Sequence, residues 1–324
     1  MLFKKKINKD SFDGFLRFKS LKKFYNITGR KKHVQKAGKN INKLKNLIQK
    51  KSNQEFRNCQ VCNSRLKNLL FDKNGFKHVK CKSCDFVYVD PILKPKVQER
   101  TLKKENSYIN VLKNKINIQL DNFRFRYGLQ KLNINKKNKK ILDFGTGYGH
   151  FLDNAKKYNW DCYGHEINKD CIKILENKKI VIDNSFKRNF YDAITLWLVF
   201  EHIPYPNKLL SKIHLSLKKG GKLLINVPNV NSLSSLILKD KCTMFAGSQH
   251  VNHFSDKSLK MILNKNNFKV KSMETIISDA GTVLNYLNYG DGLSKDFKKS
   301  ILVDPKFIHK HKLGYTLLAI AEKK

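Results

Sequence analysis

Apolar residues in the C-terminal part of the chain fall in short runs that alternate with stretches of helical spacing. From Lys139 onward each apolar run has the length of a strand. Strands that alternate with helices build βαβ units, so the pattern predicts an α/β domain with a doubly wound, mainly parallel sheet. The seven predicted strands are KKILDFG, WDCYGHE, KKIVID, YDAITLWLVF, GGKLLINVP, FKVKSMETI and LGYTLLAIAEK.

The chain before this domain has a different pattern, which predicts three further regions. A strongly basic segment comes first, and a short region with two cysteine pairs follows it. A charged connector of helical spacing then leads into the α/β domain. The predicted boundaries are 1–57 for the basic segment, 58–90 for the cysteine region, 91–138 for the connector and 139–324 for the α/β domain.

One part of the basic segment has a clear apolar face. Ile41, Leu44, Leu47 and Ile48 gather on one side of a helical wheel. The spacing predicts a short helix that packs on the body of the protein or on a partner.

The formal net charge of +40 indicates an anionic partner such as nucleic acid or a membrane surface. Most of the basic residues are Lys rather than Arg, however, and a genome rich in A and T would encode the same excess. Both explanations remain open. No apolar run reaches the roughly 20 residues that cross a bilayer, and the N-terminus lacks the apolar region of a signal peptide. The sequence therefore predicts a cytoplasmic protein without a transmembrane segment.

Four of the seven cysteines fall in two CxxC pairs. Cys59 and Cys62 form the first pair, and after 18 residues Cys81 and Cys84 form the second. This spacing is typical of a zinc ribbon, in which each pair holds one side of a tetrahedral ion. Four thiolates leave no coordination position for water, so the predicted Zn²⁺ is structural. His78 is available as a substitute ligand, although the four cysteines do not need it.

A glycine loop follows the first predicted strand of the α/β domain. It contains Gly145, Gly147 and Gly149, and a helix is predicted directly after it. Glycines let the backbone turn sharply and approach a ligand closely. A dinucleotide-binding fingerprint would have its third glycine at position 150, where this chain has His150. The loop therefore indicates a nucleotide-like ligand but disfavours NAD.

An acidic residue accompanies the glycine loop. Glu166 stands 17 residues after Gly149, at the end of the next predicted strand. The carboxyl ends of neighbouring parallel strands meet at the ligand crevice, where a carboxylate can accept both hydroxyls of a ribose. The spacing predicts that Glu166 binds a ribose.

These motifs resemble those of the class I methyltransferases that use S-adenosylmethionine (SAM), which have a Rossmann-like fold. The family motif LDxGxGxG is matched from Leu142 to Gly149, with Thr146 where the family commonly has Cys. Residues 191–206 resemble the family's fourth strand with its EHi.dP ending, and residues 217–229 resemble its LkpGGxlxixxPN turn and fifth strand. The resemblance is strongest to the branch of ubiquinone-biosynthesis O-methyltransferases and bacterial saccharide and small-molecule methyltransferases.

The resemblance implies SAM as the cofactor. Asp143 and the loop around Gly145, Thr146, Gly147 and Gly149 would hold the methionine portion, with Glu166 on the ribose. The adenine would lie near three residues after the third strand, Asp183, Asn184 and Ser185. Asp183 is equally well explained as a turn residue that ends a strand.

Three histidines are candidate general bases for an acceptor hydroxyl. His202 follows the fourth strand, and its ordinary pKa near ~6.5 suits proton transfer. Alternatively, Glu201 and His202 only cap and orient the following helix. His250 and His253 lie in the connection after the fifth strand, where related enzymes build substrate contacts.

The predicted acceptor is a small molecule or a saccharide. The stretch FVYVDP at residues 86–91 resembles a segment that follows the ribbon in that group of methyltransferases. An rRNA or tRNA acceptor is the alternative, because the basic segment resembles an RNA-binding feature and some rRNA guanine methyltransferases carry a ribbon that contacts RNA. A noncatalytic zinc-ribbon protein that binds nucleic acid would leave the ordered SAM motifs as coincidence.

Overall fold

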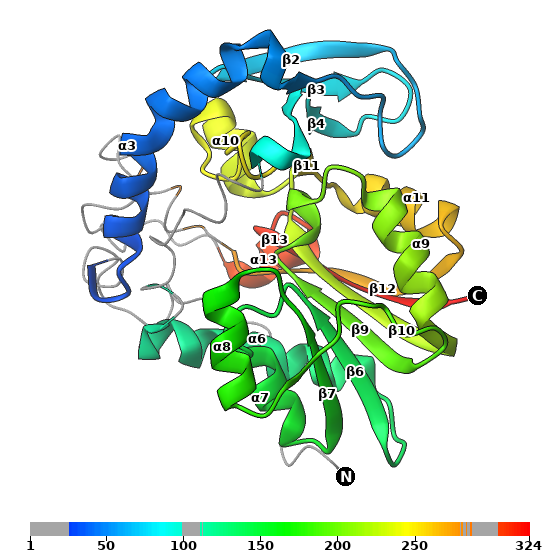
Figure 1. Cartoon of the computed structure of the whole chain (residues 1–324). Helices are drawn as coiled ribbons and strands as arrows, with labels where there is room; N and C mark the ends of the chain where they lie inside the picture. The colour runs from blue at the N-terminus through cyan, green and yellow to red at the C-terminus, as the bar shows by residue number, and fades with distance from the viewer. Residues whose placement is uncertain are drawn as a thin grey trace.

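The computed structural model describes residues 26–98, 111, 113–278, 280, 283, 286 and 304–324. The first 25 residues of the predicted basic segment lie outside them. The described residues form an α/β domain with a small β ribbon at one end of it, and the C-terminal end of a long helix lies next to the ribbon (Figure 1). None of the helices in the described ranges is both long and apolar enough to span a membrane.

The α/β domain is built on a seven-stranded sheet with the order β12-β13-β10-β9-β6-β7-β8. Strands β8, β7, β6, β9 and β10 pair in parallel, and β13 is antiparallel to both of its neighbours. The predicted fold class and all seven predicted strands are confirmed. The strands are β6 (Lys139–Phe144), β7 (Trp160–His165), β8 (Val181–Ile182), β9 (Tyr191–Trp197), β10 (Leu217–Pro228), β12 (Phe268–Ile276) and β13 (Thr316–Lys323).

Helices cover both faces of this sheet, because alternate residues of each strand point to opposite sides. Ile141 packs in one apolar cluster with α6 (Lys115–Leu132), α7 (His150–Lys156) and α8 (Lys169–Asn177). Its neighbour Leu142 packs in a second cluster, with α9 (Pro206–Ser216) and α11 (Asp256–Lys265). The shorter helices are η4 (Phe200–His202), α10 (Leu233–Leu238), η5 (Lys239–Lys241) and α13 (Pro305–Lys310).

The ribbon is a four-stranded sheet with the order β11-β4-β3-β2. Strands β2 (Lys67–Lys73), β3 (Phe76–Cys81) and β4 (Val87–Val89) are consecutive in sequence. The fourth strand, β11 (Asn252–His253), comes from the connection after β10 and pairs with β4. The ribbon sheet therefore includes a strand from the region predicted as the α/β domain, residues 139–324.

The predicted helix near residue 41 is the end of a longer one. Helix α3 (Arg30–Gln49) has 20 residues, and Ile48 is buried against Phe76 and Ile92. After η2 (Lys51–Asn53), strand β1 (Gln54–Glu55) pairs with β5 (Ile92–Leu93). The apolar face seen in the sequence thus packs on the ribbon side of the body.

A buried guanidinium joins the ribbon to the α/β domain. Arg57 Nε donates to the Val89 carbonyl at 3.1 Å, and one terminal nitrogen donates to the Pro204 carbonyl at 2.8 Å. The other terminal nitrogen donates to the Val251 carbonyl. The Arg57 amide donates to Asp90 Oδ1 at 2.9 Å. One side chain therefore donates hydrogen bonds to β4 of the ribbon and to two loops of the α/β domain.

Replacing Arg57 with Met should destabilise the protein, because it removes the donors of these carbonyls from a buried place. We expect Arg57→Met to lower the free energy of unfolding by about 2–5 kcal/mol, measured by urea denaturation. Arg65 is an exposed ribbon residue, so Arg65→Met is a matched control that should shift stability by less than about 0.5 kcal/mol. Equal effects of the two substitutions would contradict the proposed linking role.

Candidate functional site

The glycine loop takes backbone conformations that favour glycine. The φ angles of Gly145, Gly147 and Gly149 are +74°, +54° and +74°. A Cβ atom on Gly145 would lie 2.7 Å from a methyl carbon of Val199, so the loop approaches the end of β9 closely. A Cβ atom on Gly147 would have no described atom within 4 Å. The middle of the loop therefore borders open space.

The loop is anchored to the neighbouring strand β7. The His165 carbonyl accepts from the amides of Gly145 at 2.9 Å and Thr146 at 3.2 Å. The Thr146 methyl carbon would lie 2.9 Å from a Cβ atom on Gly164, so glycine at that position makes room for it. The small side chain at position 146 thus fills the gap between the loop and β7.

Glu166 lies beside the loop, as its spacing predicts. One carboxylate oxygen accepts from the Gly147 amide at 2.9 Å. The other accepts from the amides of Ile167 at 2.7 Å and Asn168 at 2.8 Å. These three amides fix the carboxylate against the glycine loop.

Asp143 is buried beneath the loop. Its Oδ1 accepts from the Thr195 hydroxyl at 2.6 Å, and the residue is only 3% exposed. Burial raises the pKa of Asp143 to about 7, although the hydrogen bond from Thr195 favours its charged form. Ionisation of this carboxyl therefore depends on pH near neutrality.

Asp183 and Asn184 follow the short strand β8. The Asp183 carboxylate accepts from the Ser185 amide at 2.8 Å and from the Tyr191 hydroxyl. Burial would raise the pKa of Asp183, but the hydrogen bonds from Ser185 and Tyr191 lower it below its ordinary value. Asn184 is exposed and donates to the Glu166 carbonyl at 3.4 Å. Asp183 thus organises this turn, and Asn184 lies next to the ribose-binding candidate.

Two of the three candidate bases meet with an acidic residue after β9. One possible ligand atom from each of Glu201, His202 and His250 lies within 4.8 Å of the others. His202 Nδ1 lies 3.1 Å from the Gln249 carbonyl, and His250 Nδ1 lies 2.8 Å from the Met244 carbonyl. From the sequence, Glu201 was predicted only to cap and orient the following helix. Its position next to His202, after a strand that borders the crevice, was the sequence feature that could have indicated its place in this cluster.

Burial dominates the ionisation of this cluster. It raises the pKa of Glu201 to about 8 and lowers that of His202 to about 3, with His250 nearby as a further cause. The pKa of His250 is also lowered by burial. Both imidazoles are therefore neutral at pH 7 and have a lone pair available.

The third candidate base lies elsewhere. His253 Nε2 is 3.1 Å from His78 Nδ1, and His253 is only 2% exposed. Burial is the main cause that lowers the pKa of His253 well below its ordinary value. The structure thus pairs His78 with a histidine of β11, away from the cysteines that it was considered to assist.

The four paired cysteines come together. Their sulfur atoms all lie within 4.8 Å of one another, with 3.5 Å from Cys59 to Cys84 and 3.5 Å from Cys62 to Cys81. Each pair sits on a similar turn. The Asn63 amide donates to the Cys59 carbonyl at 2.8 Å, and the Asp85 amide donates to the Cys81 carbonyl at 3.1 Å.

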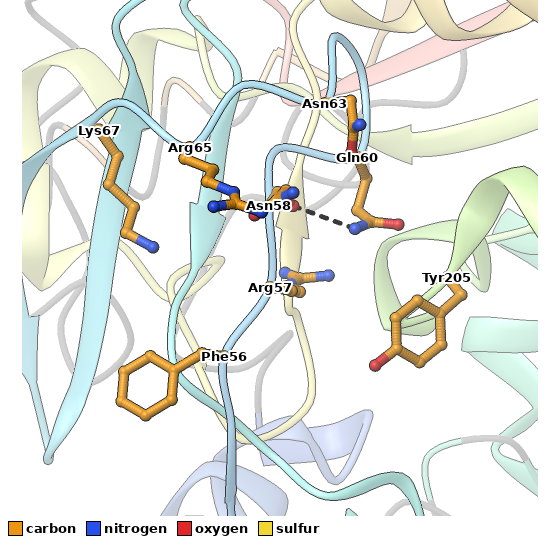
Figure 2. Close-up of a pocket in the computed structure, with 8 residues that line it drawn as sticks. All are labelled: Phe56, Arg57, Asn58, Gln60, Asn63, Arg65, Lys67 and Tyr205. Carbon is orange, nitrogen blue, oxygen red and sulfur yellow. Dashed lines mark hydrogen bonds between the residues drawn. The ribbon is translucent and has the colours of Figure 1, made fainter.

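A shallow pocket of about 450 Å³ lies where the ribbon meets the segment before α9. Figure 2 shows Tyr205 of that segment across from the side chains of the ribbon. None of the predicted site residues lines it. Its lining residues are Phe56, Arg57, Asn58, Gln60, Asn63, Arg65, Lys67 and Tyr205.

Comparison with known proteins identifies the α/β part of the chain. Residues 120–273 match the family model described as a methyltransferase domain. A solved structure of phosphoethanolamine N-methyltransferase 2 from Haemonchus contortus, in complex with SAM, superposes with a TM-score of 0.51 at 15% identity. It covers 73% of this chain and 62% of that one, and at this identity it supports the fold alone.

Two uncharacterised proteins of Methanocaldococcus jannaschii are similar in sequence. One is 28% identical over 149 residues, which cover 44% of this chain and 71% of the relative. The other is 34% identical over 102 residues, which cover 31% of this chain and 45% of the relative. The chain thus matches less than half the length of the second relative.

The buried Asp143 carboxyl should make stability depend on pH. From about pH 4 to about pH 7 the unfolded chain releases this proton, whereas the folded chain keeps it. The contribution of Asp143 to the free energy of unfolding therefore falls as pH rises through this window, and it levels off above about pH 7. Asp143→Asn removes this contribution. Relative to the variant, the wild type should lose on the order of 2–4 kcal/mol across that window, measured by urea denaturation without SAM.

Asp161→Asn, at an exposed position of β7, is the matched control and should follow the wild type at every pH. Parallel stability curves for the wild type and Asp143→Asn would contradict the raised pKa.

Proposed function

Because the chain is a SAM-dependent methyltransferase whose methyltransferase domain matches at residues 120–273, we propose that it methylates a hydroxyl of a small-molecule or saccharide acceptor. The observation that carries this proposal is the contact between Gly145 and Val199. It places the glycine loop against the segment that leads into Glu201 and His202. Strands β6 and β9 are parallel neighbours, so their carboxyl ends bring a cofactor site and an acceptor site together.

The glycine loop and Glu166 suit SAM. The open space beside Gly147 gives a ligand close access to the backbone, and the carboxylate of Glu166 borders it. We assign the ribose to Glu166, the methionine portion to Asp143 and the loop, and the adenine to the turn at Asp183 and Asn184. SAM supplies an electrophilic methyl group, and these residues hold it in place for the acceptor.

We assign removal of the acceptor proton to the cluster of Glu201, His202 and His250. Both imidazoles are neutral. His202 follows β9, the strand that borders the loop, and His250 comes from the connection after β10 to lie against it. His253 is not retained for this role, because it is buried and lies against His78.

A recessed cluster favours a small acceptor. The Glu201 side chain is 2% exposed and that of His202 is 26% exposed, so an acceptor group must enter a recess to reach them. An RNA acceptor is the second candidate, and the net charge of +40 favours it.

The test is incubation of the protein with SAM and separate pools of small molecules, saccharides and RNA, followed by mass spectrometry of the products. A methylated hydroxyl on a small molecule or saccharide is the expected product. Methylated RNA alone would replace the proposal with the second candidate. The absence of methyl transfer to any pool would count against the proposed acceptor class.

Glu166→Ala should weaken SAM binding by about 1.5–3 kcal/mol, the range for hydrogen bonds to a charged group. Isothermal titration calorimetry with SAM measures it. Glu176→Ala, at an exposed position of α8, is the matched control and should bind SAM like the wild type. Unchanged affinity in folded Glu166→Ala protein would remove the ribose assignment.

His202→Ala should lower kcat by about 10²–10⁴-fold once an acceptor is known, because it removes a group that acts on the acceptor proton. SAM affinity should stay near that of the wild type. His311→Ala changes an exposed histidine outside the cluster and serves as the control. A loss of less than tenfold would place proton removal elsewhere.

The four-cysteine cluster fits a structural zinc ion. Cysteine thiolates are preferred ligands of Zn²⁺, and four of them close its coordination. Cys59, Cys62, Cys81 and Cys84 would hold the ion between the two turns of the ribbon. The ion would stabilise the ribbon and take no part in methyl transfer.

Cys81→Ser should reduce bound zinc by one equivalent per chain and lower the stability of the ribbon. Metal analysis after purification under reducing conditions measures the first effect, and urea denaturation measures the second. Cys162→Ser, at a cysteine of β7 outside the cluster, should keep the metal. A wild-type protein that holds no zinc at these cysteines would refute the assignment.

A further inference from the structure

The two histidines in the cluster of Glu201, His202 and His250 have a fixed orientation. A backbone carbonyl only accepts hydrogen bonds, so the contacts of His202 Nδ1 with Gln249 and of His250 Nδ1 with Met244 require a proton on each Nδ1. In the neutral rings the lone pair then lies on Nε2. This arrangement is the one that orients metal-binding histidines in proteins, where the second ring nitrogen donates to a carbonyl or carboxylate.

The third member of the cluster is a buried acid, Glu201, and the described residues leave one of its carboxylate oxygens without a hydrogen bond. Among the described residues none forms a hydrogen bond with Glu201 Oε2, and Glu201 is 2% exposed. Its Oε1 lies 3.9 Å from His202 Nε2. A buried carboxylate without compensation is unfavourable, and a cation beside it would satisfy it.

The backbone holds the three residues together. The Val251 amide donates to the Glu201 carbonyl at 3.0 Å, which ties the loop carrying His250 to η4. The rings of His202 and His250 meet edge to face, with 4.8 Å between their centres. The donor atoms are therefore gathered by two different segments of the fold and do not depend on one flexible loop.

From this geometry we propose that Glu201, His202 and His250 bind a divalent first-row transition-metal ion. Two imidazole nitrogens and one carboxylate oxygen are a donor set that suits Zn²⁺, Co²⁺ or Fe²⁺ better than Mg²⁺ or Ca²⁺. Three protein ligands leave at least one coordination position for another oxygen. This site is separate from the four cysteines, which form a closed set.

The role of the ion, unlike its binding, rests on the proposed function. An acceptor hydroxyl in the open position would release its proton to solvent water more easily, because the ion would stabilise the resulting alkoxide, whose oxygen then forms the bond to the methyl group as the sulfur of SAM leaves. His202 then holds the ion and acts on the acceptor proton through it.

The test uses the full-length, zinc-containing protein, without SAM or acceptor, so a failure of the proposed function does not affect it. The protein is titrated with Co²⁺, and the bound cobalt is counted by elemental analysis and followed by visible absorption. We expect one equivalent of cobalt with ligand-field bands and no thiolate-to-cobalt charge-transfer band. The zinc content should stay unchanged.

Variants decide where the cobalt binds. His250→Gln and Glu201→Gln should each weaken cobalt binding at least tenfold, while His311→Gln should bind it like the wild type. A circular dichroism spectrum and a urea unfolding transition like those of the wild type verify that each variant is folded. Wild-type protein that binds no cobalt, cobalt that shows only a thiolate charge-transfer band, or unchanged cobalt binding in folded His250→Gln would each overturn the proposal.

Discussion

The buried guanidinium of Arg57 is the interaction on which the arrangement of the molecule depends. Its hydrogen bonds reach β4 of the ribbon and the loops at Pro204 and Val251. Burial lowers the pKa of Arg57 to about 10, so the group stays charged at neutral pH. Asp90 lies next to it and also pairs with Lys67, which places negative charge near the buried cation.

This link connects the ribbon to the candidate site through the backbone. Val251 accepts from Arg57 and from the Val89 amide, and its own amide donates to the Glu201 carbonyl. His250 is the residue directly before Val251. The ribbon therefore sets the distance between His250 and Glu201, and a ribbon stabilised by zinc would support the cluster without touching the acceptor.

The buried carboxyls of the α/β domain differ in their surroundings. Glu166 accepts hydrogen bonds from three backbone amides beside the loop, whereas Asp143 accepts one from the Thr195 hydroxyl. Glu201 has still fewer partners among the described residues, and its pKa rises further. Carboxyl groups of similar chemistry thus differ in their surroundings because the fold gives each a different set of hydrogen-bond donors.

The sequence by itself determined the α/β fold, the order of the motifs and the position of Glu166 at the end of the strand next to the glycine loop. These depend on short-range pattern, since a strand, a glycine turn and a helix are encoded within a few neighbouring residues. The four cysteines were also predictable, because the spacing within each pair is local.

Only the tertiary structure decided which distant residues meet. His202 and His250 are 48 positions apart, and their contact depends on the loop that β11 fixes to the ribbon. Arg57 showed no signal beyond being one basic residue in a basic segment, and His253 looked as suitable a base as His250. Burial and long-range hydrogen bonds distinguish these residues from others of the same type. Both arise only when the ribbon packs on the α/β domain.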